Sequence, residues 1–366
     1  MSEISTQFEA LNLNELEPLA RGKLTQSAYD YYSSGAADEI TVRRNQAAFS
    51  EISLRPRMLV DISNLQTSVS LFGQLVSMPI LVAPMAFQAM AHAQGELATA
   101  RAAAAANTVM ICSTLSNYSI EEIAAVANGN LWFQLYVYKG REITRSLVRR
   151  AEAAGYKALV VTVDSPLLGR RERDVRNRFQ LPKELRIANF EGEETLGQFP
   201  LNVRESGLHA YIAELYDRAL TWKDLEWMVS ITKLPVLVKG ILRGDDAVRA
   251  IECGARGIIV SNHGGRQLDT AIATIEALPE VVEAAGAKAE ILMDGGVRRG
   301  TDVLKALALG AKAVLLGRPI LWGLAIAGPQ GPAHVLQMLR GEFELAMALS
   351  GCPTLQSISD DLLVRK

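Results

Sequence analysis

Residues 234–262 read LPVLVKGILRGDDAVRAIECGARGIIVSN, with a short apolar run near each end. The runs at 234–240 and 256–262 are continuously apolar rather than alternating, which is typical of strands buried on both faces of a parallel sheet. The segment between them, 244–254, is amphipathic and ends in Gly254, and glycine is a common stop for a helix. This stretch therefore predicts one strand–helix–strand unit.

The same alternation extends in both directions along the chain. Eight strand-like runs, alternating with Ala-rich amphipathic segments, predict a closed (β/α)8 TIM barrel. The alternative is a doubly wound open sheet, which usually carries a glycine-rich phosphate loop after its first strand; PMAFQAMAHAQGE (84–96) is not such a loop. The six other strand-like runs are 78–84, 108–113, 131–137, 157–164, 290–296 and 312–318.

Length and composition limit the class of protein. The chain has 366 residues, is 49% hydrophobic and carries a formal net charge of −2, as soluble globular proteins do. A general nucleic-acid binder would need a basic field, and a membrane span would need an apolar run of roughly 18 residues, so neither partner is expected. The length alone suggests two domains, but barrels often exceed that expectation as one.

We predict one domain covering residues 1–366. The extra length is assigned to a helical N-terminal cap (1–77), a long lid inserted after the fourth strand (168–215), and two helices within 330–366. The lid region is rich in charge, glycine and proline, and a connection of this length is usually functional or mobile.

Cysteine and histidine usage argues against disulfides and metal sites. The three cysteines, Cys112, Cys253 and Cys352, are far apart and form no CxxC pair, and the four histidines share no metal-ligand spacing. The acidic first 20 residues have no apolar core of the kind that a signal peptide needs, so a cytoplasmic location is expected.

Polar side chains gather where the predicted strands end. In barrel enzymes the chemistry sits at the carboxyl ends of the strands, so these side chains predict an active site. Loop starts are polar in any barrel, but here the set includes a lysine, a histidine, two aspartates and an arginine. The set is Ser113, Gln134, Tyr136, Thr162, Asp164, Lys239, Ser261, Asn262, His263, Asp294, Gly317 and Arg318.

Glycine-rich segments follow the last two strands, at 294–300 and 317–319. This is the usual phosphate site of the fold, so a phosphorylated ligand is expected there. His263 suits a general base near neutral pH, and Arg266 suits a substrate carboxylate. From the residues alone Lys239 is either a Schiff-base nucleophile or a fixed cation.

Several motifs together resemble the FMN-dependent 2-hydroxy-acid oxidase family. They include FQLYVYK (133–139), VTVDSPLLGRRERDVRNRF (161–179), SNHGGRQLD (261–269) and DGGVRRGTD (294–302), and the resemblance runs from about residue 8 to residue 360. It implies the FMN-binding (β/α)8 barrel, a small L-2-hydroxy acid and O2 as reactants, and a homotetramer or homo-octamer.

The resemblance also implies catalytic roles. His263 would be the base, Asp164 would stabilise the imidazolium of His263, and Tyr136 would hydrogen-bond the substrate hydroxyl. Lys239 would lie near flavin N1 and O2, where negative charge develops, which favours the electrostatic role over the Schiff base.

Binding residues are implied in the same way. Tyr31, Arg171 and Arg266 would hold the substrate carboxylate. The flavin ring would contact Pro84, Met85, Ala86, Ser113, Gln134, Thr162 and Ser261, and the ribityl chain and phosphate would contact Asp294, Gly296, Arg298, Gly317 and Arg318.

Substrate choice depends on a departure from the family pattern. By the family resemblance, Leu115 occupies the position at which plant-type glycolate oxidases have a tryptophan. The smaller leucine leaves room for a substrate methyl group, which favours L-lactate over glycolate. Ala86 fits an oxidase. The alternatives are a glycolate oxidase, an oxygen-insensitive dehydrogenase that uses a quinone or cytochrome, and a catalytically silent barrel with a binding role.

Overall fold

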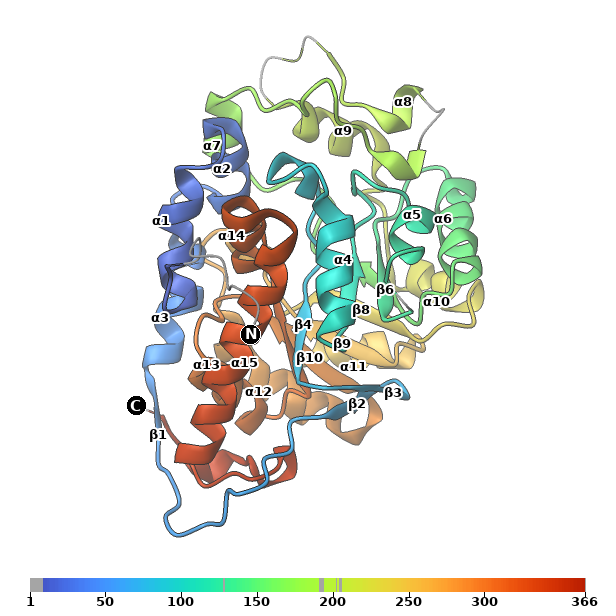
Figure 1. Cartoon of the computed structure of the whole chain (residues 1–366). Coiled ribbons are helices and arrows are strands. Elements are labelled where there is room, and N and C mark those ends of the chain that lie inside the picture. The colour runs from blue at the N-terminus through green and yellow to red at the C-terminus, as the bar shows by residue number, and fades with distance from the viewer. Residues whose placement is uncertain (1–8, 128, 191–193, 202, 204–205, 366) are drawn as a thin grey trace.

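A closed barrel of parallel strands forms the centre of the molecule (Figure 1). The computed structural model describes residues 9–127, 129–190, 194–201, 203 and 206–365. Each barrel strand falls within one of the eight predicted runs or extends it by a single residue, so the predicted TIM barrel is confirmed. The strands are β4 (Ile80–Val82), β5 (Met110–Cys112), β6 (Leu131–Leu135), β7 (Leu159–Thr162), β8 (Val236–Ile241), β9 (Gly257–Val260), β10 (Glu290–Asp294) and β11 (Ala313–Leu316).

Helices surround the barrel and connect its strands. Local caps start several of them: Ser119 accepts from the N–H of Glu122 while the Glu122 side chain accepts from the Ser119 N–H. The outer helices are α4 (Gly95–Ala105), α5 (Ile120–Ala124), α6 (Arg141–Ala153), α10 (Trp222–Ser230), α11 (Gly244–Glu252), α12 (Thr274–Ala285), α13 (Gly300–Ala308) and α14 (Arg318–Ala327).

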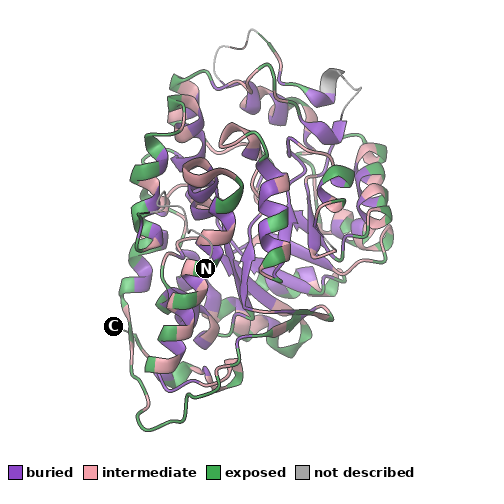
Figure 2. Ribbon diagram, viewed as in Figure 1, coloured by how far each residue is buried: buried purple, intermediate pink, exposed green. Residues whose placement is uncertain are grey.

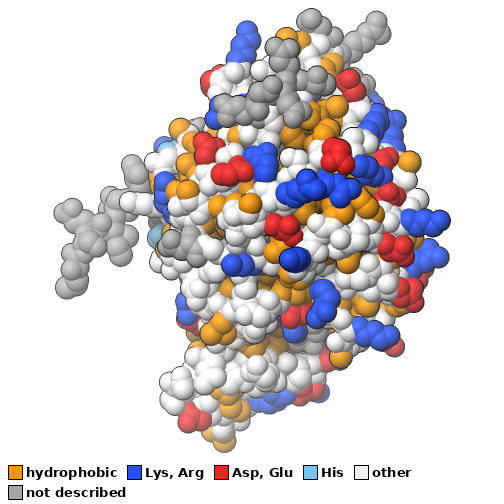
Figure 3. Space-filling view, turned by 90° about the vertical axis from the view of Figure 1, so that its right-hand side faces the viewer, with side chains coloured by type: hydrophobic (Ala, Val, Ile, Leu, Met, Phe, Trp, Pro, Cys, Tyr) orange, Lys and Arg blue, Asp and Glu red, His pale blue; other side chains and the backbone are white. Residues whose placement is uncertain are grey.

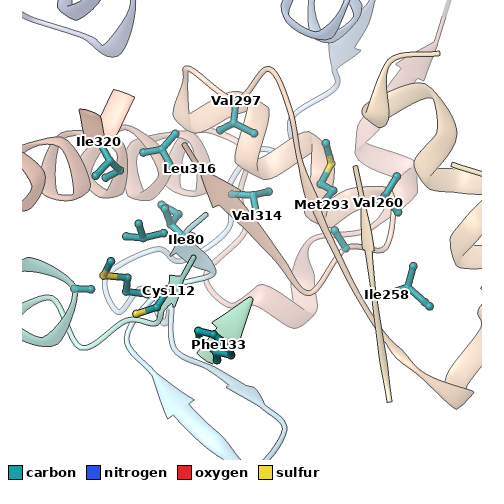
Figure 4. Packing of buried hydrophobic residues seen from close by; sticks show 14 of the residues in the cluster. Ile80, Cys112, Phe133, Ile258, Val260, Met293, Val297, Val314, Leu316 and Ile320 are labelled. Carbon is teal, nitrogen blue, oxygen red and sulfur yellow. The ribbon is translucent and has the colours of Figure 1, made fainter. Parts of the chain in front are cut away.

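The barrel strands are buried on both faces, as their continuous apolar runs predict (Figure 2). One set of alternate residues packs outward against the helices, and Figure 4 shows Ile80, Phe133 and Val314 from this set with Ile320 of α14. The other set fills the interior of the barrel. This interior layer contains Leu81, Ile111, Trp132, Val160, Leu237, Ile259, Leu292 and Leu315.

A hairpin closes the amino end of the barrel. Its strands, β2 (Val69–Leu71) and β3 (Gln74–Val76), join through Phe72 and Gly73, which both have positive φ. The ring of Phe72 packs 5.4 Å from that of Trp132 in the interior layer, and Trp132 Nε1 donates to the Gln74 side chain at 2.8 Å. The hairpin therefore works as a plug below the interior layer.

The region predicted as a helical cap (1–77) is helical only in its first part, in α1 (Leu16–Arg21), α2 (Gln26–Ser33) and α3 (Ile40–Ser50). After α3 the chain forms β1 (Ile52–Leu54), which pairs antiparallel with β12 (Leu363–Arg365), and then the plug. The alternation around Phe72–Gly73 was the available signal for the hairpin. Residues 1–8 lie outside the described part.

The predicted lid, 168–215, lies over the carboxyl end of the barrel in Figure 1. It contains α7 (Glu172–Arg176), α8 (Glu194–Gly197) and α9 (Gly207–Leu215); its residues 191–193, 202, 204 and 205 lie outside the described part. Of the two helices predicted within 330–366, the structure forms one, α15 (Gly331–Leu349). The chain after it makes short turns and β12 instead, because Gly351 and Pro353 interrupt a helix.

Acidic and basic side chains are interspersed on the face shown in Figure 3, which agrees with the small net charge. Among the helices of the described residues, none has the length and apolar character that crossing a bilayer requires.

Candidate active site

A cavity of about 1130 Å³, counting its open mouth, lies at the carboxyl ends of the barrel strands. Of the predicted site residues, only Asp164 and Ser261 are absent from its wall. The predicted residues that line it are Tyr31, Pro84, Met85, Ala86, Ser113, Leu115, Gln134, Tyr136, Thr162, Arg171, Lys239, His263, Arg266, Asp294, Gly296, Arg298, Gly317 and Arg318.

The pleat of the strands explains why these side chains meet. Residues two apart on a strand face the same side, so the residue two positions after an interior apolar one points toward the same axis, one layer higher. Gln134 follows the interior Trp132 in this way, and Lys239 follows Leu237. Apolar packing in the interior layer thus aims the polar layer into the cavity.

His263 and Asp164 form a close pair. His263 Nδ1 lies 2.8 Å from Asp164 Oδ1, which also accepts a hydrogen bond from Ser165 Oγ at 2.9 Å. Burial lowers the pKa of His263, and the attraction of Asp164 opposes that effect without cancelling it. Burial alone would raise the pKa of Asp164, but His263 and then Lys239 outweigh it, so the carboxyl pKa is lowered. The pair therefore combines a neutral imidazole with a carboxylate.

Lys239 is buried beside two polar partners. Its ammonium group donates to Ser261 Oγ at 2.8 Å and lies 3.0 Å from Asp294 Oδ2. Ser261 Oγ also accepts from the His263 N–H at 3.1 Å. Ser261 thus lies behind the cavity wall and links Lys239 to the histidine loop, a contact that the sequence did not reveal.

Gln134 connects three neighbouring strands through its amide. Its Oε1 accepts from Ser113 Oγ at 3.3 Å, and its Nε2 donates to Thr162 Oγ1 at 3.1 Å. All three side chains are buried, so this polar row is held in a fixed arrangement along one side of the cavity.

Two arginines line the cavity. Arg171 comes from the predicted lid and donates through Nε to the Arg266 carbonyl at 3.3 Å. The guanidinium carbon of Arg266 lies 5.0 Å from the centre of the Tyr31 ring, which stacks on Phe179 at 4.5 Å. Burial, and then the charge of Arg266, lower the pKa of Arg171 to about 10. Arg171 is buried and Arg266 half-buried, and two such cations that repel each other are suited to an anionic ligand.

Arg266 and Arg318 also hold the end of α2. Arg266 Nη1 donates to the carbonyls of Tyr31 and Ser34, and Arg318 donates to those of Tyr32, Gly264 and Ser34. Both guanidinium groups thus satisfy free carbonyls at a helix C-terminus. Burial, and then the charge of Arg266, lower the pKa of Arg318 to about 9. These contacts between the two arginines and the N-terminal cap were not predicted, because a sequence does not show in which direction an arginine side chain points.

The glycine-rich loops make a cradle suited to a phosphate-bearing group. Gly295 and Gly296 have φ of 95° and 88°, and a Cβ at Gly296 would lie 1.9 Å from the Asn45 carbonyl oxygen. Gly317 is the N-cap of α14, whose amino end faces the cavity beside Arg298. Asp294 Oδ1 is buried and has no hydrogen-bond partner among the described residues. A ligand with hydroxyl groups and a phosphate, as FMN has, fits these groups.

The remaining wall is apolar. Leu115 lines it, and the predicted lid adds Leu168 together with Leu208 and Ile212 from α9. Leu208 and Ile212 were not predicted to line the cavity, because they reach it only where α9 folds back over the barrel. Among the described residues, no three His, Cys, Asp or Glu side chains cluster as a metal site would require.

Comparison with known proteins agrees with this geometry. The profile of a family described as FMN-dependent dehydrogenase matches residues 20–365. The chain belongs to this family. FMN is therefore its cofactor, and the cradle described above has the donors that the cofactor needs.

Relatives within the FMN-dependent dehydrogenase family are similar over nearly the whole chain. An L-lactate oxidase from Nostoc sp. is 57% identical over 357 residues, which are 96% of this chain and 98% of that protein. A glycolate oxidase from Spinacia oleracea is 54% identical over 96% of this chain and 95% of its own length. A crystal structure of mandelate oxidase with (S)-4-hydroxymandelic acid aligns with a TM-score of 0.91 at 43% identity, covering 98% and 99% of the two chains.

Proposed function

We propose that the protein oxidises an L-2-hydroxy acid, with L-lactate preferred, and reduces O2 to H2O2. In this reaction lactate loses two electrons and two protons to become pyruvate, and O2 gains them. The observation that carries the proposal is the pair of His263 and Asp164 at 2.8 Å, in a cavity whose wall also presents Arg171 and Arg266.

His263 is the proposed base, removing a proton from the C2 centre of the substrate, either from carbon or from its hydroxyl. Its lowered pKa keeps the imidazole neutral, and therefore able to accept a proton, near neutral pH. Asp164 stabilises the imidazolium that results, since its own lowered pKa keeps it ionised. The pair is also closed off by burial, which strengthens this attraction.

The substrate anchors are proposed as follows. Arg171 and Arg266 bind the carboxylate together with Tyr31, and Tyr136 hydrogen-bonds the hydroxyl. Burial, and then the charge of Asp164, raise the pKa of Tyr136, so it stays protonated and can donate that hydrogen bond. These contacts orient C2 toward His263.

FMN, when bound, supplies the two-electron acceptor. Ser113, Gln134 and Thr162 are proposed to hydrogen-bond the ring, with residues 84–86 against it, and Lys239 to place positive charge beside it. Ser261, which lies behind Lys239, is proposed to act through that lysine. The proposed holders of the ribityl chain and phosphate are Asp294, Gly296, Arg298, Gly317 and Arg318.

The preference for L-lactate over glycolate rests on Leu115. Its buried side chain belongs to an apolar wall that suits a substrate methyl, and one methyl is worth about 1–3 kcal/mol in such a pocket. The relative named L-lactate oxidase supports the same choice. The glycolate oxidase relative keeps glycolate as the second candidate.

The test is a steady-state comparison of L-lactate, glycolate, longer L-2-hydroxy acids and L-mandelate, with peroxide measured in air. We expect the highest kcat/KM with L-lactate and one H2O2 formed per pyruvate. A higher kcat/KM with glycolate would establish the second candidate instead. Rapid flavin reduction without peroxide would replace the oxidase by a dehydrogenase with another acceptor.

We also propose that residues 1–366 act as one domain and assemble as a homotetramer or homo-octamer. Exposed apolar side chains support the assembly: Met58, Leu59 and Ile62 project from one loop, and Leu345 and Leu349 from α15. A Cβ at Gly351, just after α15, would lie 3.1 Å from Val60, so the loop and the end of α15 form one apolar edge.

A further inference from the structure

A reciprocal pair of amides joins the N-terminal cap to the histidine loop. Asn45, on α3, donates through Nδ2 to Asn262 Oδ1 at 2.9 Å, and Asn262 Nδ2 donates back to Asn45 Oδ1 at 2.7 Å. The two residues are 217 positions apart in sequence and only 2% and 4% exposed. Buried polar groups are costly unless satisfied, so a complete exchange of this kind fixes one arrangement.

Asn262 in turn holds the turn that presents His263. Its Oδ1 and its carbonyl oxygen both accept from the Gly265 N–H, at 3.1 and 3.0 Å. His263, Gly264 and Gly265 have φ of 57°, 64° and 77°, three successive residues in the left-handed region. A histidine there is strained, and such a conformation persists only where surrounding contacts over-determine it.

Asn45 is not part of the cavity wall that the described residues form. Its Oδ1 has one further contact, with the Thr274 N–H at 3.4 Å, and Asn262 Nδ2 also donates to the Ile272 carbonyl at 3.1 Å. Its side chain hydrogen-bonds the histidine loop and also lies beside the glycine cradle, since a Cβ at Gly295 would be 3.4 Å from Asn45 Nδ2. It would influence His263 by holding the histidine loop.

We propose that Asn45 is a positioning residue, which through Asn262 keeps His263 in contact with Asp164. The proposal rests on the proposed function, in which His263 is the base. It adds a task for the cap: α3 completes the geometry of the base from outside the cavity.

The protonation of His263 gives a readout that a general loss of stability would not move. The charged groups facing His263 are Asp164 after β7, Lys239 on β8 and Arg171 in the predicted lid. Of these, only Asp164 raises the pKa of His263, because the other two are cations. If the loop shifts while the imidazole stays buried, His263 loses the contact with Asp164 but keeps the effect of burial, so its pKa falls further.

The experiment compares two variants with the wild type, all loaded with FMN. Asn45→Ala and Asn45→Leu both remove the amide, and the leucine keeps nearly the same side-chain size, so it gives a second reading if the alanine variant does not fold. The measurements are the His263 pKa from NMR titration of isotope-labelled histidine, the rate of flavin reduction by L-lactate, the FMN Kd and the Tm. Thr41→Val is the matched control, because Thr41 is buried on the same helix and donates to the Ala271 carbonyl rather than to Asn262.

We expect both Asn45 variants to lower the His263 pKa, to move the rising limb of kcat/KM to lower pH, and to slow flavin reduction by about 10-fold to 100-fold. Thr41→Val should lower the Tm without moving the His263 pKa. The NMR titration does not depend on turnover. An inactive wild type would therefore refute the proposed function, whereas the titration would still test whether Asn45 positions His263.

Three results would overturn the inference. One is an unchanged His263 pKa in both Asn45 variants, whatever their rates. Another is weaker FMN binding with full activity once the cofactor is restored, which would assign Asn45 to the glycine cradle at Gly296. The third is an equal shift of the His263 pKa in Thr41→Val, which would show that the shift comes from weaker packing of α3 as a whole and not from the Asn45 amide.

Discussion

At the scale of single residues, the site depends on side chains that converge from distant parts of the chain. His263 follows β9 and Asp164 follows β7, yet they meet at 2.8 Å. Both residues follow apolar runs in the sequence, which predicted their place at strand ends, and the family resemblance predicted that they pair. The left-handed turn at His263 could not be predicted from the sequence, because that conformation depends on contacts with Asn262 and Ser261.

The first prediction concerns His263 itself. His263→Ala should keep FMN and slow flavin reduction by about 10²–10⁴-fold, the usual contribution of a general base. In the wild type, kcat/KM should rise with pH as the imidazole loses its proton. Since the His263 pKa is lowered, that rise should be complete below the range of an ordinary histidine. Stopped-flow reduction and a pH profile measure both, with His334→Ala on α15 as the control. Retention of wild-type reduction rates in His263→Ala would remove it as the base.

The second prediction concerns Leu115. Leu115→Trp should lower the ratio of kcat/KM for L-lactate to that for glycolate by about 10-fold or more, because the indole fills the space for the methyl. Steady-state assays with both acids measure the ratio. Leu168→Val, on the same wall, is the control for a general disturbance of the cavity. A ratio that stays constant in Leu115→Trp would mean that another residue selects the substrate.

At the scale of elements, α4 ties two loops of the site together through a buried carboxyl group. Glu96 Oε1 accepts from the N–H of Gln88 at 3.1 Å and of Asn117 at 3.2 Å. These belong to the loops that carry Ala86 and Leu115. Glu96 Oε2 is buried without a hydrogen-bond partner among the described residues. Burial raises the pKa of Glu96 to about 7.

The third prediction follows from that raised pKa. Between pH 4.5 and about 7 the folded protein keeps a proton on Glu96 that the unfolded chain has lost, so stability falls as pH rises through this window. Glu96→Gln cannot ionise and should be more stable than the wild type at pH 8 by up to about 3 kcal/mol, but equal to it near pH 4.5. Urea unfolding of both proteins with excess FMN at the two pH values measures the difference. The same difference at both pH values would show that Glu96 does not titrate in this window.

The elements also show what a sequence can and cannot reveal. Continuous apolar runs marked the barrel strands, because burial on both faces leaves a direct compositional signal. The pairing of β1 with β12 left no comparable signal, since each strand has three residues and their contact joins segments far apart in the sequence. Likewise, the placement of Leu208 and Ile212 in the cavity depends on how α9 folds back, which no local pattern specifies.

At the scale of the whole molecule, the apolar edge near Leu59 supports the proposed assembly. Leu59 is fully exposed, with φ of 60°, a conformation that a free leucine would rarely adopt. The fourth prediction is that Leu59→Asp places a charge in the proposed subunit interface and shifts the protein to a smaller assembly. Light scattering after size-exclusion chromatography measures the mass. Leu75→Asp, at an exposed position on β3, should leave it unchanged. An unchanged mass in Leu59→Asp would separate this edge from the assembly.

The plug formed by β2 and β3 has a kinetic consequence. Because Phe72 and the packed interior layer close the amino end of the barrel, traffic of small molecules is confined to the carboxyl end. The hydroxy acid, the keto acid and O2 then enter or leave one after another through the same mouth of the cavity. A keto acid that dissociates slowly would delay both the reoxidation of FMN by O2 and the binding of the next hydroxy acid. It should therefore act as an inhibitor with respect to both the hydroxy acid and O2.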